Sequence, residues 1–95
     1  MTARPDVVVD ARGLRCPMPV LELARRAAGL PGGSVVALLS DDPAAASDVP
    51  AWCTMRGHDY LGEGPAPDGG GSTYLVRVPN AGGGGSPSAR PSSAR

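Results

Sequence analysis

The chain has 95 residues, with nine basic and nine acidic side chains and no formal net charge. This length allows one small core, and the balanced charge argues against the basic surface that nucleic acids or anionic membranes attract. No apolar run approaches the roughly 18 residues of a membrane span, and residues 1–6 lack the apolar centre of a signal peptide. We therefore expect a cytoplasmic domain with protein partners, no membrane contact and no direct nucleic-acid binding.

The first predicted elements are a strand and a helix. Residues 7–11 are rich in β-branched side chains, and Gly13 and Pro17 follow them. The fixed φ of Pro17 suits the first position of a helix, which places Cys16 at or beside the N-cap. Gly29 and Pro31 provide the end of this helix. Its apolar stripe is predicted to comprise Val20, Leu21, Ala24, Ala27 and Ala28.

Cys16 is the predicted reactive residue. A sulfur atom at a helix N-terminus faces free backbone N–H groups and the positive end of the helix dipole, both of which favour a thiolate. Arg12 and Arg15 add positive charge, so the thiol pKa is predicted to fall from about 8.5 toward neutrality. Pro17 and Pro19 stiffen the first turn. The alternative interpretation is a small buried residue without reactivity.

The second strand is predicted at residues 34–40, a continuous apolar run that suits a central position covered by helices. The strand–helix–strand unit should be parallel and right-handed. Cys16 then lies at the carboxyl edge of the first strand, where open α/β sheets usually carry their chemistry.

The next segment is predicted to form two helical pieces. Asp41 and Asp42 before Pro43 indicate a helix start, but Pro50 disfavours one continuous helix. We expect a short turn at residues 43–47 and a helix at residues 49–56 that Asp48 caps and Gly57 ends. The inner face of that helix should carry Val49, Trp52 and Cys53. Trp52 is interpreted first as a core residue and second as a residue that docks a partner.

Cys53 and His58 are secondary site candidates. Cys53 is interpreted first as a buried apolar residue, then as a resolving thiol for Cys16, and last as a second sulfur acceptor. His58 follows the helix end and is interpreted first as a surface residue without a role, and second as a group that orients a partner or a persulfide. The two cysteines are expected to be free thiols, and their spacing matches no zinc signature, so we predict neither metal nor cofactor.

Two last strands are predicted at residues 59–63 and 72–78, joined by a long loop that we expect to be mobile. Residues 74, 76 and 78 should face the core, and residues 75 and 77 a wetter side. The predicted domain spans residues 7–79, after an extension at residues 1–6. Residues 80–95 are rich in Gly, Ser, Pro and Arg and are predicted to be a disordered tail.

The segment at residues 9–20 contains the pattern D-x-x-G-x-x-C-P-x-P, with Gly13 and Cys16 at its fixed positions. Together with residues 40–43, 48–53 and 57–58, it resembles the TusA/SirA-like sulfur carrier proteins over residues 7–79. The resemblance implies a two-layer α/β sandwich of order βαβαββ, with a four-stranded mixed sheet and two helices on one face. It also implies a sulfurtransferase in which Cys16 receives a sulfane sulfur as a persulfide.

Within this resemblance, the sulfur donor is expected to be a cysteine desulfurase or a rhodanese, and the acceptor another sulfur-relay protein. The final destination stays open between tRNA thiolation, molybdenum cofactor synthesis, sulfur oxidation and selenium metabolism. Two functions of other classes also stay open. One is a thiol redox sensor that joins Cys16 to Cys53, and the other is a non-catalytic regulatory or RNA-binding module.

Overall fold

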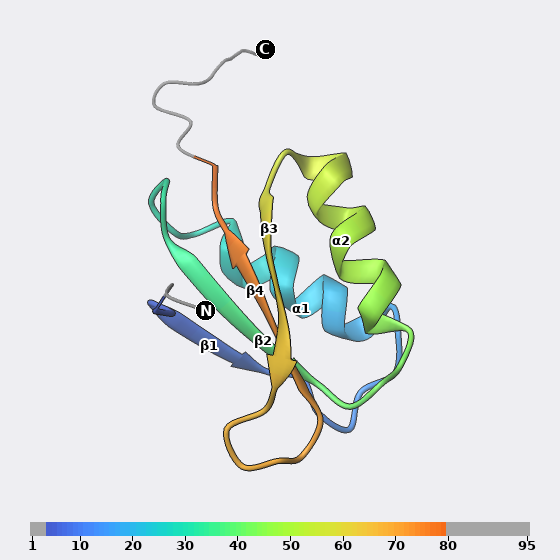
Figure 1. Cartoon of the computed structure of the whole chain (residues 1–95). Coiled ribbons are helices and arrows are strands. Elements are labelled where there is room, and N and C mark those ends of the chain that lie inside the picture. Colours follow the sequence, from blue (N-terminus) through green and yellow to red (C-terminus); the bar gives the residue numbers. More distant parts are fainter. Residues whose placement is uncertain (1–3, 80–95) are drawn as a thin grey trace.

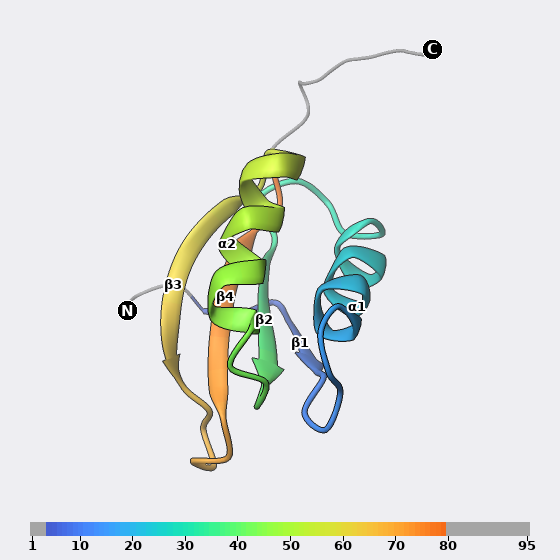
Figure 2. The same ribbon diagram turned by 90° about the vertical axis from the view of Figure 1, so that its right-hand side faces the viewer.

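The computed structural model describes residues 4–79. Four strands form one mixed sheet, and two helices pack on the same face of it (Figures 1 and 2). This arrangement confirms the predicted two-layer α/β sandwich. In chain order the elements are β1 (Val7–Asp10), α1 (Met18–Ala27), β2 (Val35–Ser40), α2 (Ala45–Arg56), β3 (Asp59–Pro65) and β4 (Ser72–Arg77).

The sheet has the strand order β1-β2-β4-β3. Strand β1 runs parallel to β2, as predicted, and β4 runs antiparallel to both of its neighbours. Every residue of β2 is buried, which fits its predicted central place. Helix α1 lies against β1 and β2, while α2 lies against β3 and β4. The chain leaves β1 and β2 at the same edge, where the following loops meet.

Helix α1 confirms the predicted apolar stripe in part, because Ala27 is buried and Val20 and Ala24 pack against the core. Its buried side chains are Pro19, Leu23 and Ala27, which recur every four residues and therefore share one side. Leu21 is 52% exposed because it lies two residues, more than half a turn, away from Leu23. Ala28 is exposed as well. The prediction that Leu21 and Ala28 face the core is wrong.

Helix α2 is continuous, so the predicted division into two pieces is wrong. Pro50 lies inside this helix, where it removes a single intrahelical hydrogen bond. Packing against the sheet compensates, because Val49, Trp52 and Cys53 are buried on the inner face as predicted. Gly57 ends the helix in the left-handed conformation at φ 74°, also as predicted.

The β3–β4 connection, which the sequence predicts to be mobile, makes hydrogen bonds at several points. The Ala66 N–H donates to the Gly71 oxygen at 3.0 Å, and the Gly69 N–H donates to the Ala66 oxygen at 2.9 Å. The Asp68 carboxylate is also bound by Arg12, which follows β1. The loop is therefore bound by two hydrogen bonds of its own backbone and by the side chain of Arg12.

The two faces of β4 differ from the predicted pattern at one position. Tyr74, Val76 and Val78 join the helix-covered core as expected. Leu75 is also buried, because it packs with Val35, Ala37 and Leu61 on the outer face of the sheet. Among residues 4–79, no helix is long and apolar enough to cross a membrane.

Candidate functional site

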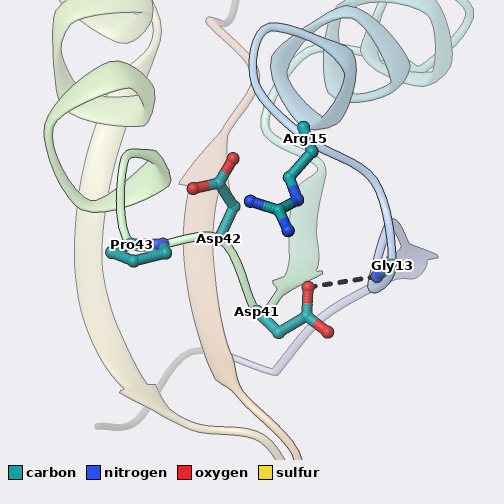
Figure 3. Close-up of a pocket in the computed structure, with 5 residues that line it drawn as sticks. All are labelled: Gly13, Arg15, Asp41, Asp42 and Pro43. Atoms are coloured by element: carbon teal, nitrogen blue, oxygen red, sulfur yellow. Dashed lines mark hydrogen bonds between the residues drawn. The ribbon is translucent and has the colours of Figure 1, made fainter.

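Cys16 lies in the loop between β1 and α1, and two carboxylates of the β2–α2 turn hold this loop. The Gly13 N–H donates to Asp41 Oδ1 at 3.0 Å, as Figure 3 shows, and the Cys16 N–H donates to Asp42 Oδ2 at 2.7 Å. Gly13 has a φ of 87°, which side-chain-bearing residues rarely adopt. The conformation of Gly13 and the two aspartates thus fix the backbone of the loop that carries Cys16.

The Cys16 thiol lies in an environment that disfavours its charged form. Partial burial is the main cause, followed by a hydrogen bond to Asp48 and the negative charges of Asp42 and Asp48, and together they raise the pKa of Cys16 to about 11. The predicted fall of this pKa toward neutrality is therefore wrong. At neutral pH the group is a thiol that faces two carboxylates.

The start of α1 offers the Cys16 sulfur fewer free backbone N–H groups than an ordinary helix N-terminus. Pro17 occupies the N-cap, one residue beyond Cys16, and the Cys16–Pro17 peptide bond is cis. The Met18 N–H donates to the Arg15 oxygen at 2.8 Å, and Pro19 has no N–H. Two of the first donors that could face the sulfur are thus engaged or missing. The prediction that Cys16 lies beside the N-cap is nevertheless confirmed.

Arg12 does not supply the free positive charge that was predicted beside the sulfur. Its guanidinium donates to both Asp68 oxygens at 2.7 and 2.8 Å and to both Asp10 oxygens at 3.0 and 2.8 Å. It also donates to the Gly70 oxygen at 3.3 Å. The Arg12 side chain therefore links the end of β1 to the β3–β4 loop.

Arg15 is the basic residue whose charge remains near the site. Its side chain is exposed, and Figure 3 shows the guanidinium directed toward Asp42. The pKa of Asp42 is lowered by the N–H groups of Cys16 and Ala44 and, to a smaller extent, by the charge of Arg15. Gly13, Arg15, Asp41, Asp42 and Pro43 together line a cavity of about 410 Å³.

Cys53 and His58 lie apart from this loop. Cys53 is 1% exposed on the inner face of α2, where burial, aided by the charge of Asp59, raises its pKa to about 11. Its interpretation as a buried apolar residue is confirmed. His58 follows the C-terminal end of α2, whereas Asp48 lies in its first turn, and the His58 ring packs against Trp52 at a tilt of 44° with ring centroids 4.5 Å apart. Within residues 4–79, no group of three His, Cys, Asp or Glu side chains could hold a metal ion.

Sequence reasoning missed three groups around the sulfur. Asp42 and Asp48 were assigned to helix ends, and Tyr74 to the core. Tyr74 is only 2% exposed, yet its hydroxyl lies within electrostatic reach of Cys16, Glu63 and Asp42. The parallel β1–β2 pair offered a signal for Asp42, because loops that follow parallel strands meet at one edge. Asp48 gave no comparable signal, since its position depends on the continuity of α2.

The raised pKa leads to a testable reactivity. Because Cys16 is protonated at neutral pH, we expect iodoacetamide to modify it more slowly at about pH 7.5 than it modifies N-acetylcysteine, whose thiol pKa is not raised. The rate should climb about tenfold per pH unit between about pH 7 and pH 10 without a plateau. Peptide mass mapping assigns the modification to Cys16. A plateau near neutral pH would contradict this description of the site.

Comparisons with known proteins agree with this architecture. Residues 7–78 match the model of the family described as Sulfurtransferase TusA. YrkF of Bacillus subtilis (strain 168), whose name describes it as a sulfur carrier protein, is 39% identical over 59 residues, which are 62% of this chain and 32% of YrkF. The matched segment thus spans about a third of that relative.

A solved structure gives the same result for the fold. The crystal structure of the SirA-like protein from Desulfitobacterium hafniense superposes with a TM-score of 0.57 at 25% identity. The superposition covers 76% of this chain and 95% of that protein. The family match includes the Cys16 loop, both helices and all four strands. The chain therefore belongs to the TusA family of sulfur carrier proteins.

Proposed function

We propose that Cys16 accepts a sulfane sulfur as a persulfide and relays it to an acceptor protein. The observation that carries this proposal is the contrast between the two thiols. Cys16 is partly exposed on a backbone fixed by Asp41 and Asp42, whereas Cys53 is buried under α2. A relay needs a sulfur atom that two successive partners can reach, and Cys16 meets this requirement.

The chemistry of the transfer needs only thiol–disulfide exchange. The Cys16 thiol loses its proton to solvent, and its sulfur attacks the outer sulfur of a donor persulfide. A new S–S bond forms on Cys16 while the donor S–S bond breaks, and the donor cysteine leaves as a thiolate. The sulfane sulfur passes on without net oxidation or reduction. In the second half, an acceptor thiolate attacks the same sulfur and Cys16 becomes the leaving group.

The proposed donors are a cysteine desulfurase or a rhodanese, and the proposed acceptor is another sulfur-relay protein. Delivery to tRNA thiolation, molybdenum cofactor synthesis or sulfur oxidation remains within this proposal. Arg15 is the residue proposed to steer partners and to face the anionic persulfide, because Arg12 is held by Asp10 and Asp68. No cofactor is required by this exchange.

Intact mass spectrometry tests the proposed function. The reduced protein is incubated with a cysteine desulfurase and free cysteine or, separately, with a rhodanese and thiosulfate. We expect a gain of about 32 Da, one sulfur atom, that dithiothreitol removes, as expected for a reversible sulfur cap on cysteine. Omitting the donor enzyme gives the background. Absence of this gain with both donors contradicts the proposal.

A further inference from the structure

An apolar groove lies directly beside the Cys16 loop. It has a volume of about 320 Å³ and is lined by Pro17, Val20, Asp48, Ala51, Trp52 and Met55. Met55 is 75% exposed at its rim, and Met18 and Leu21 are exposed nearby on α1. Large apolar side chains gathered in this way next to a reactive residue are typical of a surface that another protein covers.

The charge of the groove indicates the chemistry of that partner. Asp48 is the carboxylate in its wall, and it is also one of the groups that raise the pKa of the Cys16 thiol. Both Asp42 oxygens, in contrast, are engaged by the Cys16 and Ala44 N–H groups. In the part of the chain that the structure describes, no basic side chain forms an ion pair with Asp48.

Building on the proposed function, we propose that the protein exchanging sulfur with Cys16 seats an apolar side chain in this groove and places an adjacent arginine or lysine on Asp48. The groove supplies the apolar contact, and Asp48 supplies the complementary charge. RNA does not fit this surface, because its phosphates meet the carboxylates of Asp42 and Asp48.

The same contact prepares the sulfur for transfer. The charged and titratable groups facing Cys16 are Asp42 from the β2–α2 turn, Asp48 from α2, Tyr74 from β4, and Arg15 from its own loop through its interaction with Asp42. A cation on Asp48 offsets one of the two negative charges that add to the effect of partial burial and raise the pKa of Cys16. The thiolate then forms where a correct partner is docked.

Three measurements on Asp48→Asn test this inference, with Asp59→Asn as the matched control. Asp59 pairs with Arg77 at the opposite edge of the sheet. The first measurement compares the rates at which two reagents modify Cys16. One is 2-aminoethyl methanethiosulfonate, a cation, and the other is 2-sulfonatoethyl methanethiosulfonate, an anion. The wild type should prefer the cation, and Asp48→Asn should reduce the ratio of the two rates about tenfold. The control should keep the wild-type ratio.

The second measurement is sulfur loading from a cysteine desulfurase or a rhodanese at varied donor concentration. In Asp48→Asn the half-saturating concentration should rise about tenfold, because an ion pair with the donor is lost. The third measurement is the rate at which neutral iodoacetamide modifies Cys16. This rate should be higher in Asp48→Asn than in the wild type, because the loss of the Asp48 carboxylate lowers the pKa of Cys16. A merely structural defect would not move these two readouts in opposite directions.

The outcomes separate this inference from the proposed function. Normal loading of the wild type together with an unchanged half-saturating concentration in Asp48→Asn overturns the inference alone. An unchanged ratio for the charged reagents overturns it as well. If neither donor loads the wild type, the proposed function fails and the inference fails with it.

Discussion

Replacing Cys16 by serine is expected to abolish the gain of sulfur completely, whereas Cys53→Ala should be loaded to the wild-type extent. The serine oxygen cannot form the persulfide, and Cys53 cannot take over because it is 1% exposed beneath α2. Intact mass after incubation with the donor, with and without dithiothreitol, measures both variants. Alanine is chosen at position 53 because a serine hydroxyl would be buried there without an assured partner.

The control for this experiment is the fold of each variant. Cys16 is only partly buried, so Cys16→Ser should keep the far-ultraviolet circular dichroism and the unfolding midpoint of the wild type. Loading of a folded Cys16→Ser protein would place the acceptor sulfur on Cys53. Loss of loading in a folded Cys53→Ala protein would show that both thiols take part.

Gly71→Ala is expected to destabilise the fold strongly and to impair loading. Gly71 has a φ of 105°, and a Cβ atom there would lie 2.7 Å from the Ser40 backbone oxygen and 3.3 Å from the Asp41 Cα. Backbone atoms cannot yield as a flexible side chain can. We expect a loss of about 3 kcal/mol in the free energy of unfolding, measured by urea denaturation, in the range of mutations that combine backbone strain with a steric clash.

Gly69→Ala separates the two causes of this loss. Gly69 also has a positive φ, 81°, but no heavy atom lies within 4 Å of its added Cβ. It should cost only the conformational strain, about 1 to 2 kcal/mol. Since the clash at Gly71 displaces Ser40 and Asp41, which begin the turn that holds the cysteine loop, only Gly71→Ala should also slow loading. Equal effects of the two substitutions would contradict this interpretation.

Most helices and strands could be predicted from the sequence, because the residue patterns that indicate them are local. The β-branched run at residues 7–11, the apolar run at residues 34–40 and the closing Gly57 each determine an element or its end without help from distant residues. The break predicted at Pro50 failed for the opposite reason. A proline costs a helix one hydrogen bond locally, and the burial of Val49, Trp52 and Cys53 against the sheet outweighs that cost.

The candidate site was predicted in position but not in electrostatics. Cys16 lies where the motif and the strand edge placed it. Its neighbours along the chain, Arg12 and Arg15, indicated positive surroundings. In the folded chain, however, Arg12 forms an ion pair with Asp68, and Asp48 lies near the sulfur. These partners are 56 and 32 residues away in sequence. Spacing along the chain carries no information on contacts of that range.

The surroundings of Cys16 also affect how readily its sulfur is oxidised. Peroxides attack thiolates, and repeated attack drives cysteine to sulfinic and sulfonic acids that most proteins cannot reverse. Partial burial, together with Asp48 and Asp42, raises the pKa of Cys16 to about 11, so little of the thiolate is present at neutral pH. A redox sensor would need the opposite arrangement. The raised pKa of Cys16 therefore makes its thiol more resistant to oxidation by peroxides than a thiol with an unshifted pKa.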